Sequence, residues 1–269
     1  RKAGKIYGSY VPASTMKKVY STKQDSKIIN FLQKINKIKK KQQVNLFAAH
    51  CFSDSPHLSA GMIFRDYYDQ FLETINFFRK NNTNSYWIIK PHPARSEYNE
   101  QGVIEEIVRR YKSELENVII CPENINNTKI FQVIDNLING VSTISIEFAC
   151  HGKKSIITGD APFSYGDLFF RPKHKKVYFY LLKNLDKLQT SLSKQQIILS
   201  KRILHILELQ MLFNVDKSTI LPDGYLSENL KEKEYIKKLN INVSSLKNYT
   251  IFNDPLYKDL ETKLSKLIL

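Results

Sequence analysis

The sequence predicts an α/β protein with a Rossmann-like parallel sheet, followed by a helical tail. Short apolar stretches alternate with amphipathic segments five times between residues 44 and 160. Several of these stretches are continuously apolar, as is typical of parallel strands covered on both faces. After residue 160 the pattern is mostly helical. We therefore expect a linker or partial N-terminal segment over 1–43, a Rossmann-like domain over 44–170 and a helical extension over 171–269.

The spacing of apolar residues defines the elements of the first third of the chain. Residues 1–25 are rich in Gly, Ser, Pro and Tyr, which predicts a loop or linker. Apolar runs over 44–49 and 85–90 predict strands. Helical spacing predicts helices over 26–38 and 62–80, carried by Ile28, Phe31, Leu32, Ile35 and Ile38 and by Phe64, Tyr68, Phe71, Leu72, Ile75 and Phe78.

The same two patterns continue to the end of the chain. Gly152 follows one predicted helix as its C′ residue. Strands are predicted over 118–121, from 137 to 139 and over 155–158, the last strand that the pattern indicates. Helices are predicted over 103–115, 130–137, 144–151, 177–213 and 230–269, and the last two could pack on the α/β unit or lie on a membrane.

Composition restricts the classes of protein and partner. The chain has 269 residues, three cysteines and no Cys-x-x-Cys, so a disulfide scaffold is not expected and a reducing cytoplasm fits best. No run of 18 apolar residues occurs, and no RNA-binding or zinc-finger motif is present. Nucleic acid is therefore not an expected partner.

The net charge of +15 requires a separate explanation. Lysine runs at 37–41 and 173–176 could bind an anionic membrane surface, since each basic residue near such a surface contributes about 1 kcal/mol. We expect any such attachment to be peripheral, at the inner membrane face, and sensitive to salt. The alternative, of equal weight, is that these lysines only keep the chain soluble.

Three unusual polar loops follow predicted strands. They are "HCFSDSPH" at 50–57, "KPHPAR" at 90–95 and "GVSTIS" at 140–145. The carboxyl ends of parallel strands lie at one edge of a sheet, where ligands bind, so we expect the loops to converge. The predicted catalytic residues are His50, Asp54, His57 and His92, and the predicted substrate-binding residues are Lys90, Arg95, Ser142, Thr143, Ser145 and Glu147.

These residue types suit a phosphate. His92 is held between two prolines, which restrict the backbone, and it could donate to a phosphate oxygen or protonate a leaving group. Ser142 and Thr143 precede a predicted helix, whose N-terminus favours an anion. Taken alone, each feature also has a structural explanation, such as an N-cap at Ser142-Thr143 or an Asx turn at Asp54.

Metal and dinucleotide sites are not expected. His50 and His57 lack the i, i+4 spacing of a helical zinc pair. A Gly-x-Gly-x-x-Gly and a Walker loop are both absent from the sequence. We therefore expect the charge of a phosphate to be met by His, Lys and Arg side chains and by backbone N–H groups, with no cofactor.

Three stretches resemble a known family: "AAHCFSDSPHLSAGMIFRDYYDQF", "WIIKPHPARSEY" and "GVSTISIEFACHGKKSIITGDAPFSYGDL". Over about residues 44–170 the chain resembles the C-terminal, donor-binding half of bacterial GT-B glycosyltransferases of capsule and lipopolysaccharide assembly. This group is similar to sialyltransferases, Kdo transferases and teichoic-acid polyol-phosphate polymerases. The resemblance implies that His92 and Ser142-Thr143 contact the donor phosphate and that Glu147 holds the ribose.

The resemblance also implies a second Rossmann-like domain that carries the acidic base, absent here or reduced to residues 1–43. The chain could then bind a donor without being active alone. The first hypothesis is a glycosyltransferase that moves a CMP-linked sugar to a glycan or lipid-linked acceptor, with His50, Asp54 and His57 on the acceptor side. The alternatives are a CDP-alcohol polyol-phosphate transferase and a non-catalytic module that binds an anionic polysaccharide or a membrane.

Overall fold

A computed structural model describes residues 25–54, 61–81, 85–161, 163–207 and 258. The chain divides into two compact units, one over Ser14–Ile203 and the other made of Arg1–Ala13 and Leu204–Leu269. The fold described below is that of the first unit. The predicted helix over 230–269 lies outside the described residues, apart from Lys258.

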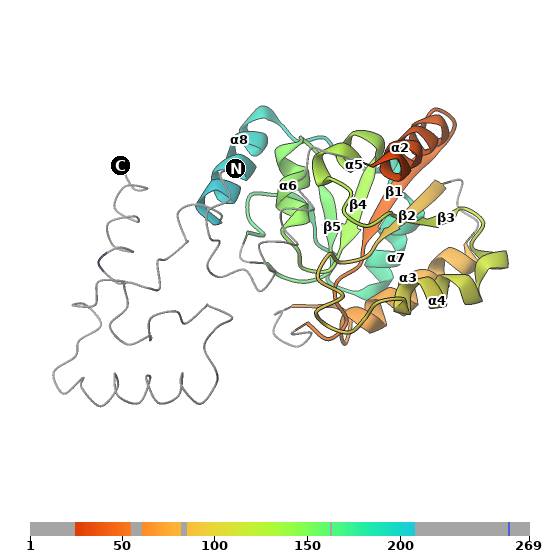
Figure 1. Ribbon diagram of the computed structural model, residues 1–269. Helices are drawn as coiled ribbons and strands as arrows, with labels where there is room; N and C mark the ends of the chain where they lie inside the picture. Colours follow the sequence, from red (N-terminus) through yellow and green to blue (C-terminus); the bar gives the residue numbers. More distant parts are fainter. Residues whose placement is uncertain (1–24, 55–60, 82–84, 162, 208–257, 259–269) are drawn as a thin grey trace, which may run out of the picture. The chain divides into compact units, whose positions relative to one another are not determined.

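The centre of this unit is a parallel sheet of six strands in the order β3-β2-β1-β4-β5-β6 (Figure 1). Each neighbouring pair is parallel. From β1 the chain adds β2 and β3 on one side. It then crosses back over β1 and adds β4, β5 and β6 on the other side. The predicted Rossmann-like sheet is confirmed, with strands β1 (Gln43–Ala48), β2 (Ser85–Lys90), β3 (Val118–Ile120), β4 (Asn136–Asn139), β5 (Ser155–Ile157) and β6 (Phe169–Phe170).

Helices cover both faces of the sheet (Figure 1). One apolar cluster joins one face to α3 (Tyr67–Lys80), α4 (Val103–Arg110) and α7 (Lys175–Lys183). A second cluster joins the other face to α2 (Ser26–Lys39), α5 (Asn127–Val133) and α6 (Ile144–Cys150). The remaining described elements are α8 (Lys194–His205) and two 3-10 turns at Lys112–Glu114 and Leu185–Lys187.

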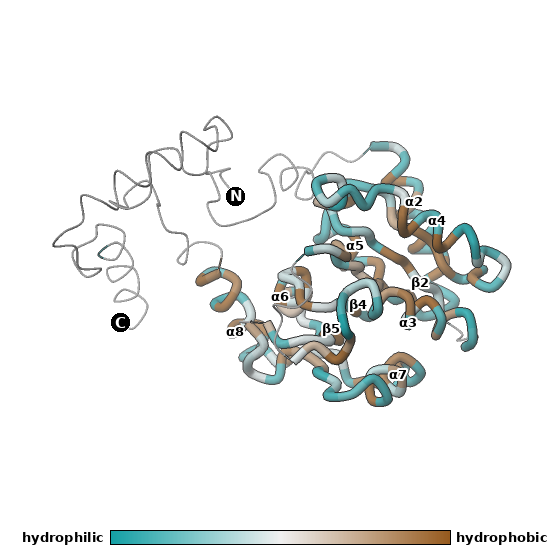
Figure 2. Tube along the Cα trace, turned by 90° about the horizontal axis from the view of Figure 1, so that it is seen from below, coloured by the Kyte–Doolittle hydropathy of each residue, from teal (hydrophilic) through white to brown (hydrophobic). Residues whose placement is uncertain are grey.

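The continuous apolar strands follow from this two-sided burial. Successive side chains of a strand point to opposite faces, so a strand covered on both sides needs an apolar residue at every position. Hydrophobic residues accordingly run through the strands, and the outer loops are hydrophilic (Figure 2). Leu46, Ile88 and Leu137 belong to the α2 side, and their neighbours Phe47, Ile89 and Ile138 belong to the α3 side.

Polar side chains fix where the helices begin and end. The Asp25 carboxylate accepts the Ile28 N–H at 2.8 Å and caps α2. Asp66 caps α3 in the same way, which is why that helix begins at Tyr67 and not at residue 62 as predicted. Gly152, at φ +86°, follows α6 in the left-handed conformation expected of a C′ glycine.

The structure contains one strand more than the sequence pattern predicts. This strand, β6, was not predicted because two residues are too short to show a pattern. The domain predicted over 44–170 lies within a compact unit over Ser14–Ile203, and its boundaries stay a prediction. Apolar residues of α2 and α7, such as Ile35 and Tyr178, lie in the two cores of the sheet. No helix among the described residues combines the length and apolar composition that crossing a bilayer requires.

If α7 is part of the sheet domain, shortening a buried side chain on it should destabilise the whole domain. Leu182 is 2% exposed, so Leu182→Ala should lower the free energy of unfolding by about 2–5 kcal/mol, through lost burial and the cavity left behind. Tyr180, 65% exposed on the same helix, provides the control. Tyr180→Ala should change the free energy of unfolding by less than about 0.5 kcal/mol. Urea denaturation measures both, and equal effects would show that α7 is not packed in the core.

Candidate ligand site at the carboxyl edge of the sheet

The predicted polar loops leave the sheet at its topological switch point. Strands β1 and β4 are neighbours, and the crossover between them reverses the direction in which the sheet is filled. Open α/β sheets bind ligands in the crevice beyond the carboxyl ends of such strands. Residues 49–54 follow β1, residues 91–95 follow β2, and residues 140–143 follow β4, so the three loops begin on adjacent strands.

The His92 imidazole is held by two contacts at Nδ1. This nitrogen accepts the Ala94 N–H at 3.2 Å and lies 3.2 Å from Cys51 Sγ. Burial raises the pKa of the Cys51 thiol, so the thiol stays protonated and can donate to Nδ1, which already accepts the Ala94 N–H. Because Nδ1 faces donors, we assign the proton of the neutral ring to Nε2. His92 therefore presents an N–H group.

His50 has the opposite tautomer. Its ring stacks on Tyr67, with centroids 4.0 Å apart, and on His92, with centroids 5.1 Å apart. Its Nδ1 lies 3.2 Å from the Cys51 carbonyl oxygen and 3.9 Å from the Asp54 carboxylate. Both groups are acceptors, so Nδ1 carries the proton and Nε2 carries the lone pair. The stacked pair thus offers one donor and one acceptor.

Burial keeps both imidazoles neutral at pH 7. The pKa of His92 is lowered to about 3, mainly by burial and also by the nearby His50 and Lys90. Burial also lowers the pKa of His50, while the hydrogen bond to Cys51 and the charges of Asp54 and Glu100 act in the opposite direction. Asp54 is in turn hydrogen-bonded to Tyr98. The carboxylate therefore favours the imidazolium of His50 over that of His92.

Lys90, the last residue of β2, is the least expected group at this edge. It is 8% exposed, and its ammonium has no hydrogen bond or ion pair among the described residues. Burial lowers its pKa, and the groups that raise it are Cys121 and Glu147. The side chain is buried while its ammonium reaches the surface of this edge and pairs with no described carboxylate, so this position favours an anionic ligand.

Glu147 of α6 lies near this cation and forms a buried pair with Asn127. The Asn127 amide donates to the Glu147 carboxylate at 3.0 Å. Its own carbonyl oxygen, Asn127 Oδ1, is buried and accepts no hydrogen bond. A buried amide oxygen without a hydrogen bond costs free energy. A ligand hydroxyl could donate a hydrogen bond to it after a small movement.

The loop after β4 brings two hydroxyl groups to the same edge. Thr143 precedes α6, and its side chain caps no backbone N–H, so the N-cap explanation does not hold for it. Ser142 is half-buried and Thr143 is exposed. Gly140 permits the close approach of this loop to α3, because a Cβ at 140 would lie 2.8 Å from the Tyr67 ring. Tyr67 thus contacts both the loop and His50.

Two predicted substrate-binding residues form hydrogen bonds or ion pairs with other side chains of the protein. Ser145 is fully buried, and its hydroxyl exchanges hydrogen bonds with the Asn139 amide at 2.8 and 3.1 Å. Arg95 pairs with Glu105 and Glu123, both at 2.7 Å. In this conformation Ser145 fixes the end of β4 and Arg95 fixes its own loop, so neither is presented to a ligand. His57 lies outside the described residues.

Tyr67 and Glu100 also position residues of the site, and no sequence pattern indicates either of them. Glu100 accepts the N–H groups of Phe52 and Ser53 at 2.8 Å each, and so ties the loop after β1 to the segment after β2. Tyr67 falls on the apolar face of a predicted helix, where an aromatic residue is ordinarily core. Asn127, at the start of a short helix, has no distinguishing pattern.

The described residues contain no group of three or more His, Cys, Asp or Glu side chains that could hold a metal ion. The expected absence of a metal stays a prediction. The lysine runs are partly engaged: Lys39 pairs with Asp135 at 3.2 Å, and Lys175 pairs with Asp69 and Glu73. Membrane binding through these runs also stays a prediction.

The fold is that of a Rossmann-like α/β protein, with a candidate ligand site at the carboxyl edge of its sheet. Residues 4–169 match the family model described as capsule polysaccharide biosynthesis protein. The match spans more than half of the 269 residues, so the chain belongs to this family. No curated protein matches it.

Among solved structures, similarity extends to glycan-building enzymes. A beta Kdo 2,4 transferase, KpsC of Thermosulfurimonas dismutans, is 13% identical with a TM-score of 0.37, over 69% of this chain and 58% of that one. The beta Kdo 2,7 transferase of the same protein is 18% identical with a TM-score of 0.36, over 71% and 58%. The wall teichoic acid polymerase TagF is 12% identical with a TM-score of 0.41, over 88% and 49%. The chain spans less than two thirds of each, and the likenesses are distant.

The low pKa of His92 predicts a loss of stability in acid. The unfolded state takes up a proton near pH 6.5, whereas the folded state does so only near pH 3, so His92 disfavours folding increasingly as the pH falls between these values. Between pH 7 and pH 5 the wild type should lose up to about 2 kcal/mol more unfolding free energy than His92→Gln. Urea denaturation at both pH values measures the difference. An identical loss in the two proteins would contradict a buried neutral His92.

Proposed function

We propose that this protein is the donor-binding part of a GT-B type glycosyltransferase of capsule polysaccharide synthesis, with a nucleotide-activated, CMP-linked sugar as donor. The family membership supports the process. The observation that carries the donor class is Lys90, a largely buried lysine whose ammonium pairs with no described carboxylate, at the switch point of a Rossmann-like sheet. A donor phosphate is the anion that this position and this charge favour.

The other groups of the edge fit the rest of the donor. The Nε2–H of His92 would donate to a phosphate oxygen, and the hydroxyls of Ser142 and Thr143 would contact the same phosphate. Glu147 and the unsatisfied oxygen of Asn127 would hold the ribose hydroxyls. In sugar transfer, the bond between the anomeric carbon and the phosphate oxygen breaks. The N–H of His92 then stabilises the negative charge that remains on the departing CMP.

His50 is suited to the acceptor. The acceptor oxygen forms the new bond to the anomeric carbon, and its proton must go to a base. The lone pair on His50 Nε2 could take that proton, while Asp54 stabilises the imidazolium that forms. His57 would act on the same side. A second domain that completes the crevice remains part of the proposal.

A second candidate uses the same phosphate site for a CDP-alcohol, which would make the protein a polyol-phosphate transferase. Both donors present a cytidine phosphate, so the same contacts could hold either one. The neutral charge state of His92 favours the first candidate, because a diphosphate carries more charge than a buried lysine alone can balance. Turnover of CMP-sugar and CDP-glycerol separates the two.

The role of Lys90 predicts opposite effects on stability and on binding. Lys90→Met replaces a buried charge by an apolar chain of similar length, so the unliganded protein should become more stable in urea. The same variant should bind CMP about 10- to 100-fold more weakly, through loss of a charge-assisted hydrogen bond. His92→Ala should weaken CMP binding by about 1–3 kcal/mol. Calorimetric titration with CMP, CDP, UDP and GDP measures this, with excess EDTA present to test binding without metal.

Lys176→Met is the matched control, because Lys176 is exposed and distant in sequence from the three loops. It should change neither stability nor CMP affinity. Unchanged CMP affinity in Lys90→Met would remove the lysine from the site. Binding that disappears in EDTA would contradict a phosphate site made only of protein groups.

A further inference from the structure

A cavity of about 620 Å³ lies beside the proposed phosphate site, and nothing above uses it. Residues 157–160, 164, 165, 167–169 and 171–173 line it, together with Gly61, which lies beside Asp160. Its size falls within the range of small-molecule sites, about 300–1,000 Å³. The cavity borders the loop after β4, because a Cβ at Gly159 would lie 2.6 Å from the Val141 side chain, one residue before Ser142.

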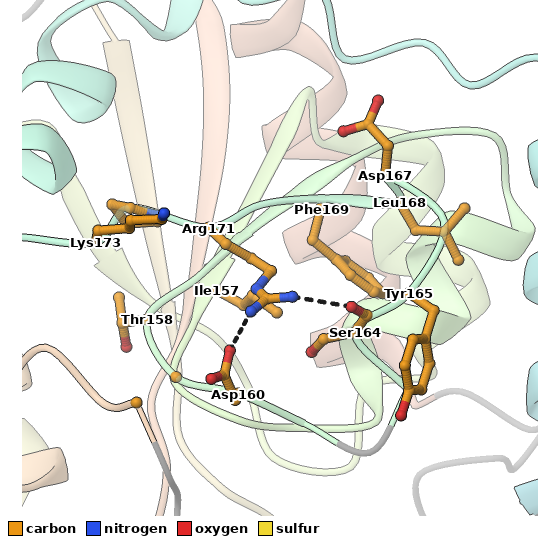
Figure 3. Close-up of a pocket in the computed structure, with 13 residues that line it drawn as sticks. Ile157, Thr158, Asp160, Ser164, Tyr165, Asp167, Leu168, Phe169, Arg171 and Lys173 are labelled. Atoms are coloured by element: carbon orange, nitrogen blue, oxygen red, sulfur yellow. Dashed lines mark hydrogen bonds and ion pairs between the residues drawn. The ribbon is translucent and has the colours of Figure 1, made fainter.

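The polar groups of the cavity form a fixed donor and acceptor pair. Arg171 reaches between Asp160 and Ser164 (Figure 3). Its Nη2 donates to Asp160 Oδ1 at 2.5 Å, and its Nη1 donates to the Ser164 carbonyl at 3.0 Å. These bonds leave Asp160 Oδ2 and Arg171 Nε–H for another partner. The two side chains are 48% and 46% exposed, so a ligand can reach both.

Gly61 allows the Asp160 carboxylate to lie against the backbone of the opposite segment. Its φ is +70°, a conformation that favours glycine, and a Cβ at this position would collide with Asp160 Oδ2. Any other residue at 61 would therefore strain the backbone and displace the carboxylate from its place at the cavity.

An aromatic ring stands at the same cavity. Tyr165 is 67% exposed, the highest value among the large hydrophobic side chains of the described residues. Figure 3 shows it next to Ser164, on the side of the cavity away from Thr158. An exposed aromatic ring beside an open polar pair combines an apolar face with hydrogen-bonding groups.

The charges of the cavity balance, so they do not select a second phosphate. Arg171 is balanced by Asp160, and Asp167 is balanced by Lys154 at 2.6 Å. Lys173 is the lining cation that lacks a described partner, and the Asp160 carboxylate would repel an anion. A ligand for this cavity needs hydroxyls that both donate and accept, and an apolar face for the ring.

We infer that this cavity binds a pyranose unit, with the Asp160–Arg171 pair holding neighbouring hydroxyls and the Tyr165 ring packing on the C–H face of the sugar. A pyranose could come from the donor, as the sugar attached to the phosphate next door, or from the growing glycan. These two sources of the sugar rest on the proposed function, whereas the binding of a pyranose to this cavity does not.

Saturation-transfer NMR on the full chain tests the inference. The probes are methyl α-glucopyranoside, N-acetylglucosamine and N-acetylneuraminic acid, and at least one should receive saturation on its ring protons. Tyr165→Ala should weaken the binding of that sugar by about two- to tenfold. Tyr180→Ala, which removes a ring exposed to nearly the same extent (65%), should leave it unchanged. Arg171→Lys, which keeps the charge but loses the planar fork, should also weaken it.

The source of the sugar is tested with CMP-N-acetylneuraminic acid. If the donor fills the cavity, Tyr165→Ala will reduce saturation of the sugar protons and spare the cytidine protons. If the glycan fills it, only the free sugars will respond to the variant. No transfer to any probe, or equal transfer from wild type and Tyr165→Ala, overturns the inference. Loss of CMP binding with sugar binding intact would instead refute the proposed function alone.

Discussion

The arrangement of this edge depends on a buried lysine at the end of a central strand. Transfer of an ammonium group into the protein costs several kcal/mol, and a direct carboxylate partner normally offsets that cost. Lys90 has no such partner among the described residues, although Glu147 is near enough to raise its pKa. Burial lowers the pKa of both neighbouring imidazoles, and the charge of Lys90 lowers that of His92 as well, so neither ring adds a positive charge. An anion bound here would remove the largest electrostatic cost of the site.

The sheet explains why the cation is there. Strands that are covered on both faces leave only their ends for polar side chains. Lys90 ends β2, and the histidines follow β1 and β2, so all three groups meet at one edge. The reversal between β1 and β4 opens the crevice at this edge. The apolar pattern of the strands and the polar character of the loops are therefore two consequences of one topology.

Much of this architecture could be predicted from the sequence. Five of the six strands follow from apolar runs, since burial on both faces leaves a strong and simple signal. Convergence of the loops after β1, β2 and β4 follows from parallel topology alone. Two features could not be found in this way. β6 has only two residues, and α7 packs in the core although its stripe of apolar residues equally suits a surface helix.

Within the site, the sequence does not show which side chains pair with one another. The sequence shows that Arg95 and Lys90 are both basic and near His92, but not that Glu105 and Glu123 balance one and leave the other. Nor does the sequence show that Ser145 pairs with Asn139. Asn139 ends β4 and Ser145 lies in the following helix α6, and their side chains meet only in the folded structure. Tautomers of His50 and His92 depend on partners within a few ångströms, which spacing does not specify.

The central claim is that a donor phosphate completes the charge of Lys90, and a crystal structure of the complex with CMP tests it most directly. The account predicts the phosphate at the carboxyl edge, within hydrogen-bond distance (about 2.7–3.2 Å) of both Lys90 Nζ and His92 Nε2. A CMP molecule bound elsewhere, or a phosphate at this edge that leaves Lys90 without a contact, would contradict it.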